Sequence, residues 1–174
     1  MAWIQTYSGI HFSPFNPKMV HLQIGDIAHH LSLQCRFSGA VRSFYSVAQH
    51  SVLVSQKVPA EYALWGLLHD AAEAYLGDMA KPFKINMPWF RMVETDIMEV
   101  VAKKYKLSWP EPPEVKMADV RLLFTERRDL MSPDSAVWDH QADHPPYIEV
   151  ISPWSPEVAE EEFLCRFGEL CPDA

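Results

Sequence analysis

The sequence has few cysteines, no basic cluster and no long uninterrupted apolar run. Its three cysteines, Cys35, Cys165 and Cys171, form no CxxC pair, so we expect neither a disulfide framework nor a zinc ribbon, and a reducing cytoplasm fits best. No stretch approaches the roughly 18 apolar residues that a membrane-spanning helix needs. The N-terminus lacks a basic segment followed by an apolar one, so no signal peptide is expected.

Positive charge is also scarce. The 174 residues include 15 Lys and Arg against 23 Asp and Glu, which gives a formal net charge of −8. Proteins that bind nucleic-acid polymers usually present a basic face, so we expect neither a nucleic-acid polymer nor a membrane as partner. A small anionic ligand remains compatible, because a metal ion and two or three local cations can outweigh a negative average.

Helical patterns dominate what is present. A composition with 48% hydrophobic and 22% charged residues is ordinary for a globular protein, and the absence of a repeat or linker predicts a single domain over residues 1–174. Asp26 and Ser46 are candidate helix N-caps, and Gly77 is a candidate helix end. The apolar periodicity predicts helices over 26–33, from 46 onward, and over 60–76, 88–107, 114–131 and 156–170. Residues 1–24 and 132–155 carry turn-formers and prolines, so we expect irregular segments there. The fold class predicted is all-α.

The most informative residues lie in the most apolar of these helices. His69, Asp70 and Glu73 occupy the 60–76 segment, where burying charge without partners is costly. His69 and Glu73 are four residues apart and share a helix face, with Asp70 on its flank. Imidazole and carboxylate together suit Zn, Mn, Fe, Co or Mg. One helix cannot supply a full ligand set, and His50 and Asp119 are the candidates on other helices.

Each of these residues also has an ordinary structural interpretation. His50 alone is more often a satisfied helix histidine than a ligand, and Asp119 can pair with Lys116 or Arg121. The order of all four along the chain is harder to explain without a metal.

That order, His50, then His69-Asp70, then Asp119, resembles the HD-domain metal-dependent phosphohydrolases. Residues 44–51, residues 69–78 and Pro82-Phe83-Lys84 are similar to segments of that family's nucleotidase branch, so the resemblance covers roughly residues 24–131. It implies a single HD-domain helical bundle with one divalent ion, Zn, Co or Mn, held by the four residues. Whether a second Mg or Co ion accompanies the phosphates is left open.

The resemblance also implies roles for other residues. Glu73 would orient the attacking water or carry its proton, and Asp78 would be a second acid near the leaving oxygen, or else a loop N-cap. Arg36 would hold phosphate and Phe37 would pack on the sugar or base. The remaining substrate-binding candidates are Lys81, Pro82 and Lys84, although Lys81 is more simply a solvated loop lysine. The other histidines fit no ligand spacing and are expected to be structural: His11, His21, His29, His30, His140 and His144.

Two activities in this branch suit a chain of this length. The cations Arg36 and Lys84, with Lys81 as an open third, exceed what one phosphate requires and favour a dATP triphosphohydrolase. In that enzyme metal-bound hydroxide attacks the α-phosphorus and releases deoxyadenosine and triphosphate. The alternatives are a 5′-nucleotidase acting on deoxynucleoside monophosphates and a non-catalytic HD domain that senses nucleotides. We expect a cytoplasmic protein (the host cytoplasm if phage-encoded). Family members form dimers or hexamers, so a homo-oligomer is expected, with contacts through the apolar faces of 88–107 and 156–170.

Overall fold

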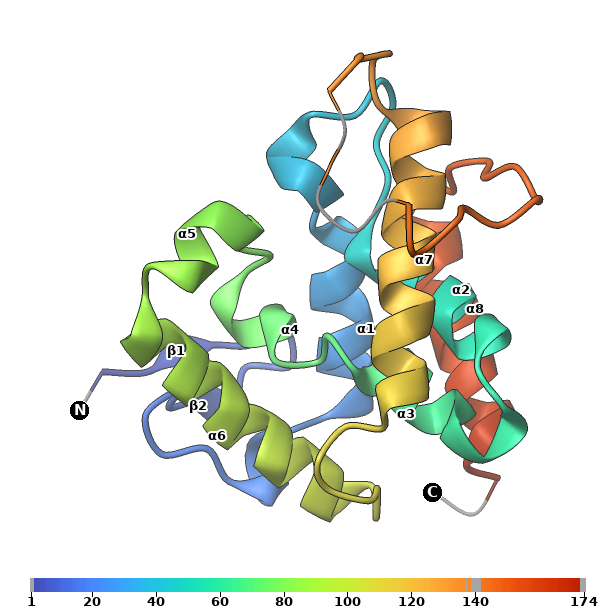
Figure 1. The fold of residues 1–174 in the computed structure, drawn as a ribbon. Helices are drawn as coiled ribbons and strands as arrows, with labels where there is room; N and C mark the ends of the chain where they lie inside the picture. The colour runs from blue at the N-terminus through green and yellow to red at the C-terminus, as the bar shows by residue number, and fades with distance from the viewer. Residues whose placement is uncertain (1, 137, 139–141, 173–174) are drawn as a thin grey trace.

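The computed structural model describes residues 2–136, 138 and 142–172, and these form a mostly helical body (Figure 1). The helices are α1 (Ile24–Leu33), α2 (Val47–Lys57), α3 (Ala63–Leu68), α4 (Glu73–Leu76), α5 (Lys81–Ile85), α6 (Pro88–Lys104), α7 (Pro113–Leu130) and α8 (Pro156–Leu170). Short 3₁₀ turns cover Met19–His21, Arg36–Gly39 and Ala60–Tyr62. The mainly helical class agrees with the sequence prediction.

The N-terminal lead-in contains two strands, which the sequence analysis did not predict. Strands β1 (Ile4–Gln5) and β2 (His11–Phe12) pair antiparallel, with Ile4 opposite Phe12. The Phe12 side chain is fully buried and its ring stacks on Tyr75 of α4, with ring centroids 3.9 Å apart. The hairpin is therefore anchored to the helical body through this ring.

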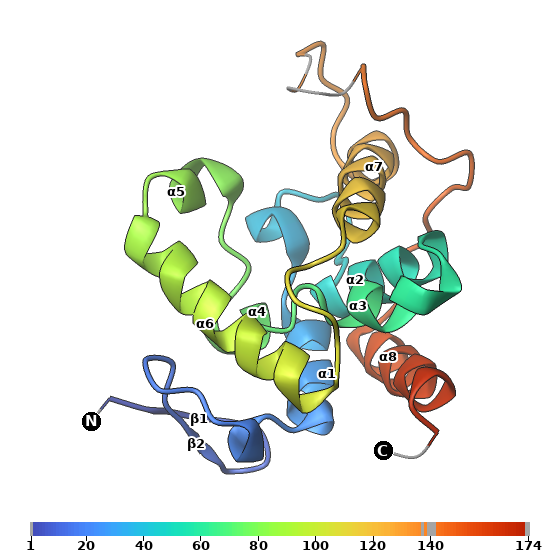
Figure 2. The ribbon, with the colours of Figure 1, turned by 60° about the horizontal axis from the view of Figure 1, so that its bottom comes forward.

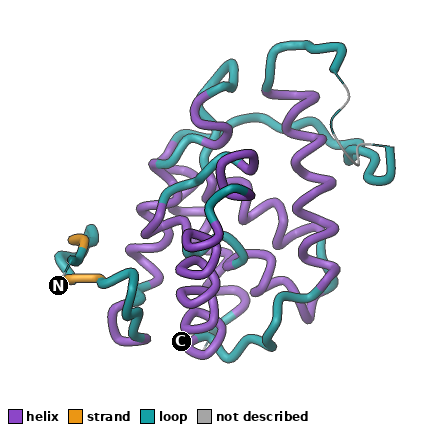
Figure 3. Tube along the Cα trace, turned by 60° about the vertical axis from the view of Figure 1, so that its left-hand side comes forward, coloured by secondary structure: helices purple, strands orange, loops and turns teal. Residues whose placement is uncertain are grey.

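Helix α2 is the central element of the fold. It packs against α1, α3, α7 and α8, and Figure 2 shows α2 and α3 lying between α7 and α8. Even its polar residues Gln49, His50 and Ser51 are buried. A buried histidine in a central helix needs polar partners from its neighbours, so this packing already locates the polar centre of the molecule. The tube view confirms how little of the body is strand (Figure 3).

Several helix boundaries follow the local signals in the sequence. The Ser46 hydroxyl accepts a hydrogen bond from the Gln49 N–H at 3.1 Å, and Ser155 caps α8 in the same way ahead of Pro156. Gly77 ends α4 with a φ of 85°, a conformation that glycine adopts without strain. These three predictions are confirmed.

Other boundaries differ from the prediction. Helix α1 begins at Ile24 after Gln23, so Asp26 is not its N-cap. Instead the Asp26 carboxylate accepts hydrogen bonds from the N–H and hydroxyl of Ser8 in the hairpin. Residues 81–85, expected as a loop, form α5, and α6 ends at Lys104 rather than near residue 107. The described residues of 132–155 contain no helix or strand, as predicted.

The expected helix over 60–76 is divided. It consists of a 3₁₀ turn, α3 and α4, with a tight turn over residues 69–72. In that turn the N–H groups of Ala71 and Glu73 donate to the carbonyls of Leu68 and Asp70, each at 2.9 Å and each three residues back. Three-residue bonds tighten the backbone relative to an α-helix. As a result, His69 and Asp70 project from the end of α3 toward α2 and α7.

Candidate metal centre

Four side chains expected as ligands lie together where α2, α3 and α7 meet. The Nε2 atoms of His50 and His69 are 3.2 Å apart, and Asp119 Oδ1 of α7 is 3.3 Å from His50 Nε2. One ligand atom from each of these three residues lies within 4.8 Å of the others, so the group can hold a metal ion. Asp70 Oδ2 joins them at 3.2 Å from His69 Nε2 and 3.7 Å from His50 Nε2.

The outer hydrogen bonds of the two histidines fix which ring nitrogen faces inward. His50 Nδ1 lies 2.6 Å from Glu126 Oε1, and His69 Nδ1 lies 2.9 Å from the Gly66 carbonyl oxygen. Both partners are acceptors, so each Nδ1 carries a proton and each Nε2 faces the centre. Two imidazole nitrogens and two carboxylates then face one another, and a metal ion could take the place of protons between them.

The charges of the cluster support the same conclusion. Burial lowers the pKa of His69, but the adjacent Asp70 carboxylate outweighs burial and raises that pKa to about 9. Burial raises the pKa of Asp119, yet its contacts with His50 and Lys116 lower the pKa well below its usual value. Burial also raises the pKa of Asp70, but the adjacent His69 lowers it well below its usual value. Asp70 and Asp119 therefore stay ionised near neutral pH, and the centre attracts positive charge. A donor set of two imidazoles and two carboxylates fits Zn, Co or Mn.

One residue behind the ligands was missed by the sequence analysis. Glu126 of α7 is fully buried, and its Oε1 accepts from the Tyr45 hydroxyl at 2.8 Å as well as from His50. Its Oε2 accepts from the Arg36 guanidinium at 3.1 and 3.3 Å. Glu126 follows Asp119 by seven residues, two helical turns, and this spacing on one helix face is the signal that could have identified it.

Two of the candidate ligands, His69 and Asp70, line a cavity of about 290 Å³. Its lining comes from α3, the turn after it, α5, α6, the segment leading into α7 and α7 itself. The lining residues are Trp65, His69, Asp70, Ala72, Lys84, Glu94, Thr95, Met98, Trp109, Glu111 and Lys116. The lining lysines already have acidic partners. Lys84 Nζ is 2.7 Å from Glu94 and 3.3 Å from Glu73, and Lys116 Nζ is 2.6 Å from Asp119.

Glu73 lies beside this group rather than within it. Its Oε1 contacts Lys84, while its buried Oε2 has no hydrogen-bond partner among the described residues. Burial raises the pKa of Glu73 well above its usual value, and the nearby Asp70 and Asp78 carboxylates raise it further. The raised pKa makes Glu73 a stronger base than an ordinary carboxylate, and its unpaired Oε2 is the atom that could take a proton.

The other expected site residues lie at varying distances from the ligands. Arg36 is 8% exposed and bound to Glu126, with Asp70 Oδ2 at 3.7 Å, so it lies behind the ligands. Phe37 contacts Arg36 but does not line the cavity. Asp78 is half-buried and its backbone N–H donates to Gln34. Lys81 and Pro82 are exposed at the start of α5, outside the cavity lining.

The remaining histidines lie apart from this cluster where they are described. His29 Nδ1 contacts Glu160 at 3.0 Å, and His30 Nδ1 contacts the Ala74 carbonyl at 2.7 Å. His140 lies outside the described residues.

The fold and the site together define a mainly helical protein with a buried His/His/Asp group suited to a divalent metal ion. No family model matches the chain. The chain is 41% identical over 172 residues to the uncharacterized protein YfdR of Escherichia coli (strain K12), covering 98% of this chain and 96% of that protein. The chain therefore belongs to the same family as YfdR. It is also 37% identical over 92 residues to an uncharacterized protein of Rhodobacter capsulatus, and this alignment covers 48% of this chain and 47% of that protein. No helix in the described ranges has the length and apolar character needed to cross a membrane.

Proposed function

We propose that this protein is an HD-domain metal-dependent phosphohydrolase that acts on a small deoxynucleotide. The observation that carries the proposal is the convergence of His50 Nε2, His69 Nε2 and an Asp119 carboxylate oxygen, beside a cavity that His69 also lines. The order of these residues with Asp70 along the chain is that of the HD family, and the helical fold is compatible with an HD bundle.

The ion would be held by His50, His69, Asp70 and Asp119. A divalent ion in such a site supplies a Lewis acid for a phosphoryl oxygen and lowers the pKa of a bound water. The chain itself supplies Glu73, whose unpaired Oε2 is available to orient the attacking water and accept its proton. Lys84, which contacts Glu73, provides a positive charge next to the phosphate.

The charges around the cavity favour a monophosphate over a triphosphate. Lys84 and Lys116 are the only Lys or Arg side chains among the described residues of the lining, and both are paired with acids. The guanidinium of Arg36 is bound to Glu126 behind the ligands. A triphosphate brings several negative charges that would need cations of their own. We therefore propose a 5′-nucleotidase acting on deoxynucleoside monophosphates, with dATP triphosphohydrolysis as the alternative substrate choice.

Substrate profiling tests this proposal. Purified protein is incubated with each deoxynucleoside monophosphate and triphosphate in the presence of Co²⁺, Mn²⁺ or Zn²⁺, and phosphate, triphosphate and nucleoside are quantified. We expect inorganic phosphate from monophosphates and none with the metal-site variant His69→Ala. The control His11→Ala, an exposed histidine of β2, should behave as the wild type.

The other outcomes select other functions. Release of triphosphate from dATP would support the triphosphohydrolase instead. Binding of metal and nucleotide without any turnover would contradict an enzymatic function and would support a nucleotide-sensing domain.

A further inference from the structure

A second feature of the cavity is an exposed indole. Trp109 lies in the segment between α6 and α7, lines the same cavity as His69 and Asp70, and is 44% exposed. Large aromatic side chains in a ligand cavity supply flat contact area at a small cost in conformational entropy. None of the roles assigned above to the metal ligands or to Glu73 uses this side chain.

Contacts made by Trp65 hold Trp109 in place. The buried Trp65 of α3 stacks against it, with ring centroids 6.1 Å apart and an interplanar angle of 29°. The indole N–H of Trp65 donates to the carbonyl of Ser108 at 2.7 Å, and Ser108 directly precedes Trp109. The exposed ring is thus supported by a rigid partner rather than carried on a free side chain.

The cavity lining combines two kinds of chemistry. It carries the charged groups His69, Asp70 and Lys84, and it also carries the apolar groups Trp65, Met98 and Trp109. A ligand that matches both has a phosphate and a planar ring in one small molecule. The cavity volume of about 290 Å³ is near the lower end of ordinary ligand pockets, which suits a single mononucleotide.

We propose that Trp109 is the base-binding residue of this site and stacks on the nucleobase of the substrate. The proposal rests on the proposed function for the identity of the ligand. Base stacking on an aromatic side chain tolerates different bases, because every base has a π face. Trp109 therefore provides affinity for nucleotides as a class, while the metal ligands act on the phosphate.

Steady-state kinetics of Trp109→Ala and Trp109→Phe test this assignment. The substrates are deoxyadenosine 5′-monophosphate and deoxyribose 5-phosphate, which lacks the base. For Trp109→Ala we expect KM for the nucleotide to rise roughly 5- to 150-fold, the range typical of losing one stacked base, with little change in kcat. KM for deoxyribose 5-phosphate should not change, and Trp109→Phe should recover much of the loss.

The matched control is Trp89→Ala on α6, which removes an exposed indole (58% exposed) that does not line the cavity. It should leave both KM values unchanged. An equal effect of Trp109→Ala on both substrates, or no effect on the nucleotide, would overturn the assignment.

A binding measurement separates this inference from the proposed reaction. Deoxyadenosine, which has no phosphate to hydrolyse, is titrated against the wild-type protein and against Trp109→Phe while tryptophan fluorescence is recorded. Quenching that is lost in Trp109→Phe and kept in Trp89→Ala supports base stacking even if no phosphate ester is hydrolysed. Equal quenching in all three proteins would overturn the inference and would leave the proposed reaction untouched.

Discussion

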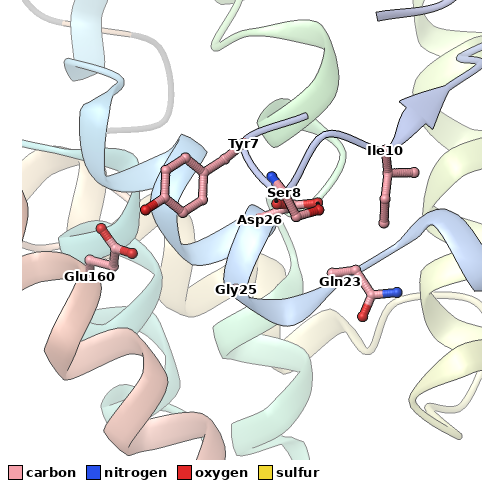
Figure 4. A pocket seen from close by; sticks show the side chains of 7 residues that line it. All are labelled: Tyr7, Ser8, Ile10, Gln23, Gly25, Asp26 and Glu160. Carbon is pink, nitrogen blue, oxygen red and sulfur yellow. Dashed lines mark hydrogen bonds between the residues drawn. The ribbon is translucent and has the colours of Figure 1, made fainter. Parts of the chain in front are cut away.

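Two buried acidic regions of this molecule differ in what satisfies their carboxylates. The first is the hollow between the N-terminal hairpin and α1 (Figure 4), lined by Tyr7, Ser8, Ile10, Gln23, Gly25, Asp26 and Glu160. There Asp26 is only 2% exposed, but the N–H and the hydroxyl of Ser8 donate to its two oxygens, each at 2.7 Å. This carboxylate is supplied with donors by the chain itself, so it serves to attach the hairpin.

The second region is the group formed by His50, His69, Asp70 and Asp119. Its Nε2 atoms and carboxylate oxygens converge at 3.2 to 3.7 Å. Their other polar atoms are already bound, as with His50 Nδ1 to Glu126. Burial of an acid is therefore not by itself a sign of function, because both regions show it. The distinguishing feature is that imidazole nitrogens and a carboxylate from three separate segments converge closely enough to hold a metal ion.

The largest expected effect comes from removing a ligand. In wild-type protein, Zn²⁺, Co²⁺ or Mn²⁺ at a hundredfold excess over its Kd should stabilise the fold by about 2.7 kcal/mol. At roughly 2–4 °C per kcal/mol for a chain of this size, Tm should rise by about 5–10 °C. His69→Ala should abolish the shift, the bound metal and all turnover. Calorimetry measures the Tm shift, elemental analysis measures the bound metal, and phosphate release measures turnover.

A metal-dependent Tm shift of equal size in His69→Ala would show that the ion binds elsewhere. Protons would then hold the converging side chains together, as the Ser8 donors do for Asp26.

Glu73→Gln should separate metal binding from catalysis. The amide keeps the shape of the side chain and an oxygen near Lys84, but it cannot take up a proton. We expect unchanged metal content and a fall in kcat of about 10²–10⁴-fold, the usual contribution of a general base. Metal analysis and initial rates measure both, with Glu99→Gln, an exposed residue of α6, as control. A retained rate would remove the role proposed for Glu73.

Glu126→Gln should weaken the metal site without removing a ligand. Loss of the charge next to His50 Nδ1 makes that imidazole a poorer ligand, and such outer partners typically contribute about 10–100-fold in metal affinity. Arg36 also loses the carboxylate that holds its guanidinium. We expect the metal Kd to rise by that factor in a calorimetric titration, with far-UV circular dichroism unchanged. Unchanged affinity would show that Glu126 only fills the core.

Much of this arrangement is readable from residue types and spacing. The helical class, the caps at Ser46 and Ser155 and the end at Gly77 depend on local signals, and these predictions agree with the structure. The order of His50, His69 and Asp119 indicates a shared metal because each residue type is a ligand and each lies in a separate helical segment. The structure brings the three together.

The features that the sequence analysis did not predict depend on how segments pack against one another. The turn over residues 69–72 contains no proline or glycine that would indicate a turn, and it forms where α3 meets its neighbours. The seven-residue spacing from Asp119 indicates that Glu126 shares its face of α7, but the contact of Glu126 with His50 depends on how α7 packs on α2. Trp109 follows the end of α6, and nothing in its local sequence indicates that Trp65 lies behind it. Sequence thus indicates which side chains carry chemistry better than it indicates what surrounds them.

The smallest effect on the metal site should come from the acid of the other region. In Asp26→Asn, one of the two Ser8 donors faces an amide NH₂ instead of an oxygen. Losing a hydrogen bond to a buried charged group costs about 1.5–3 kcal/mol, so we expect chemical denaturation to show a loss of that size. Metal affinity and phosphate release should match the wild type, because no hydrogen bond links Asp26 to the His50 and His69 cluster among the described residues. A loss of metal affinity in this variant would show that the hairpin positions the ligands and that the two regions are one unit.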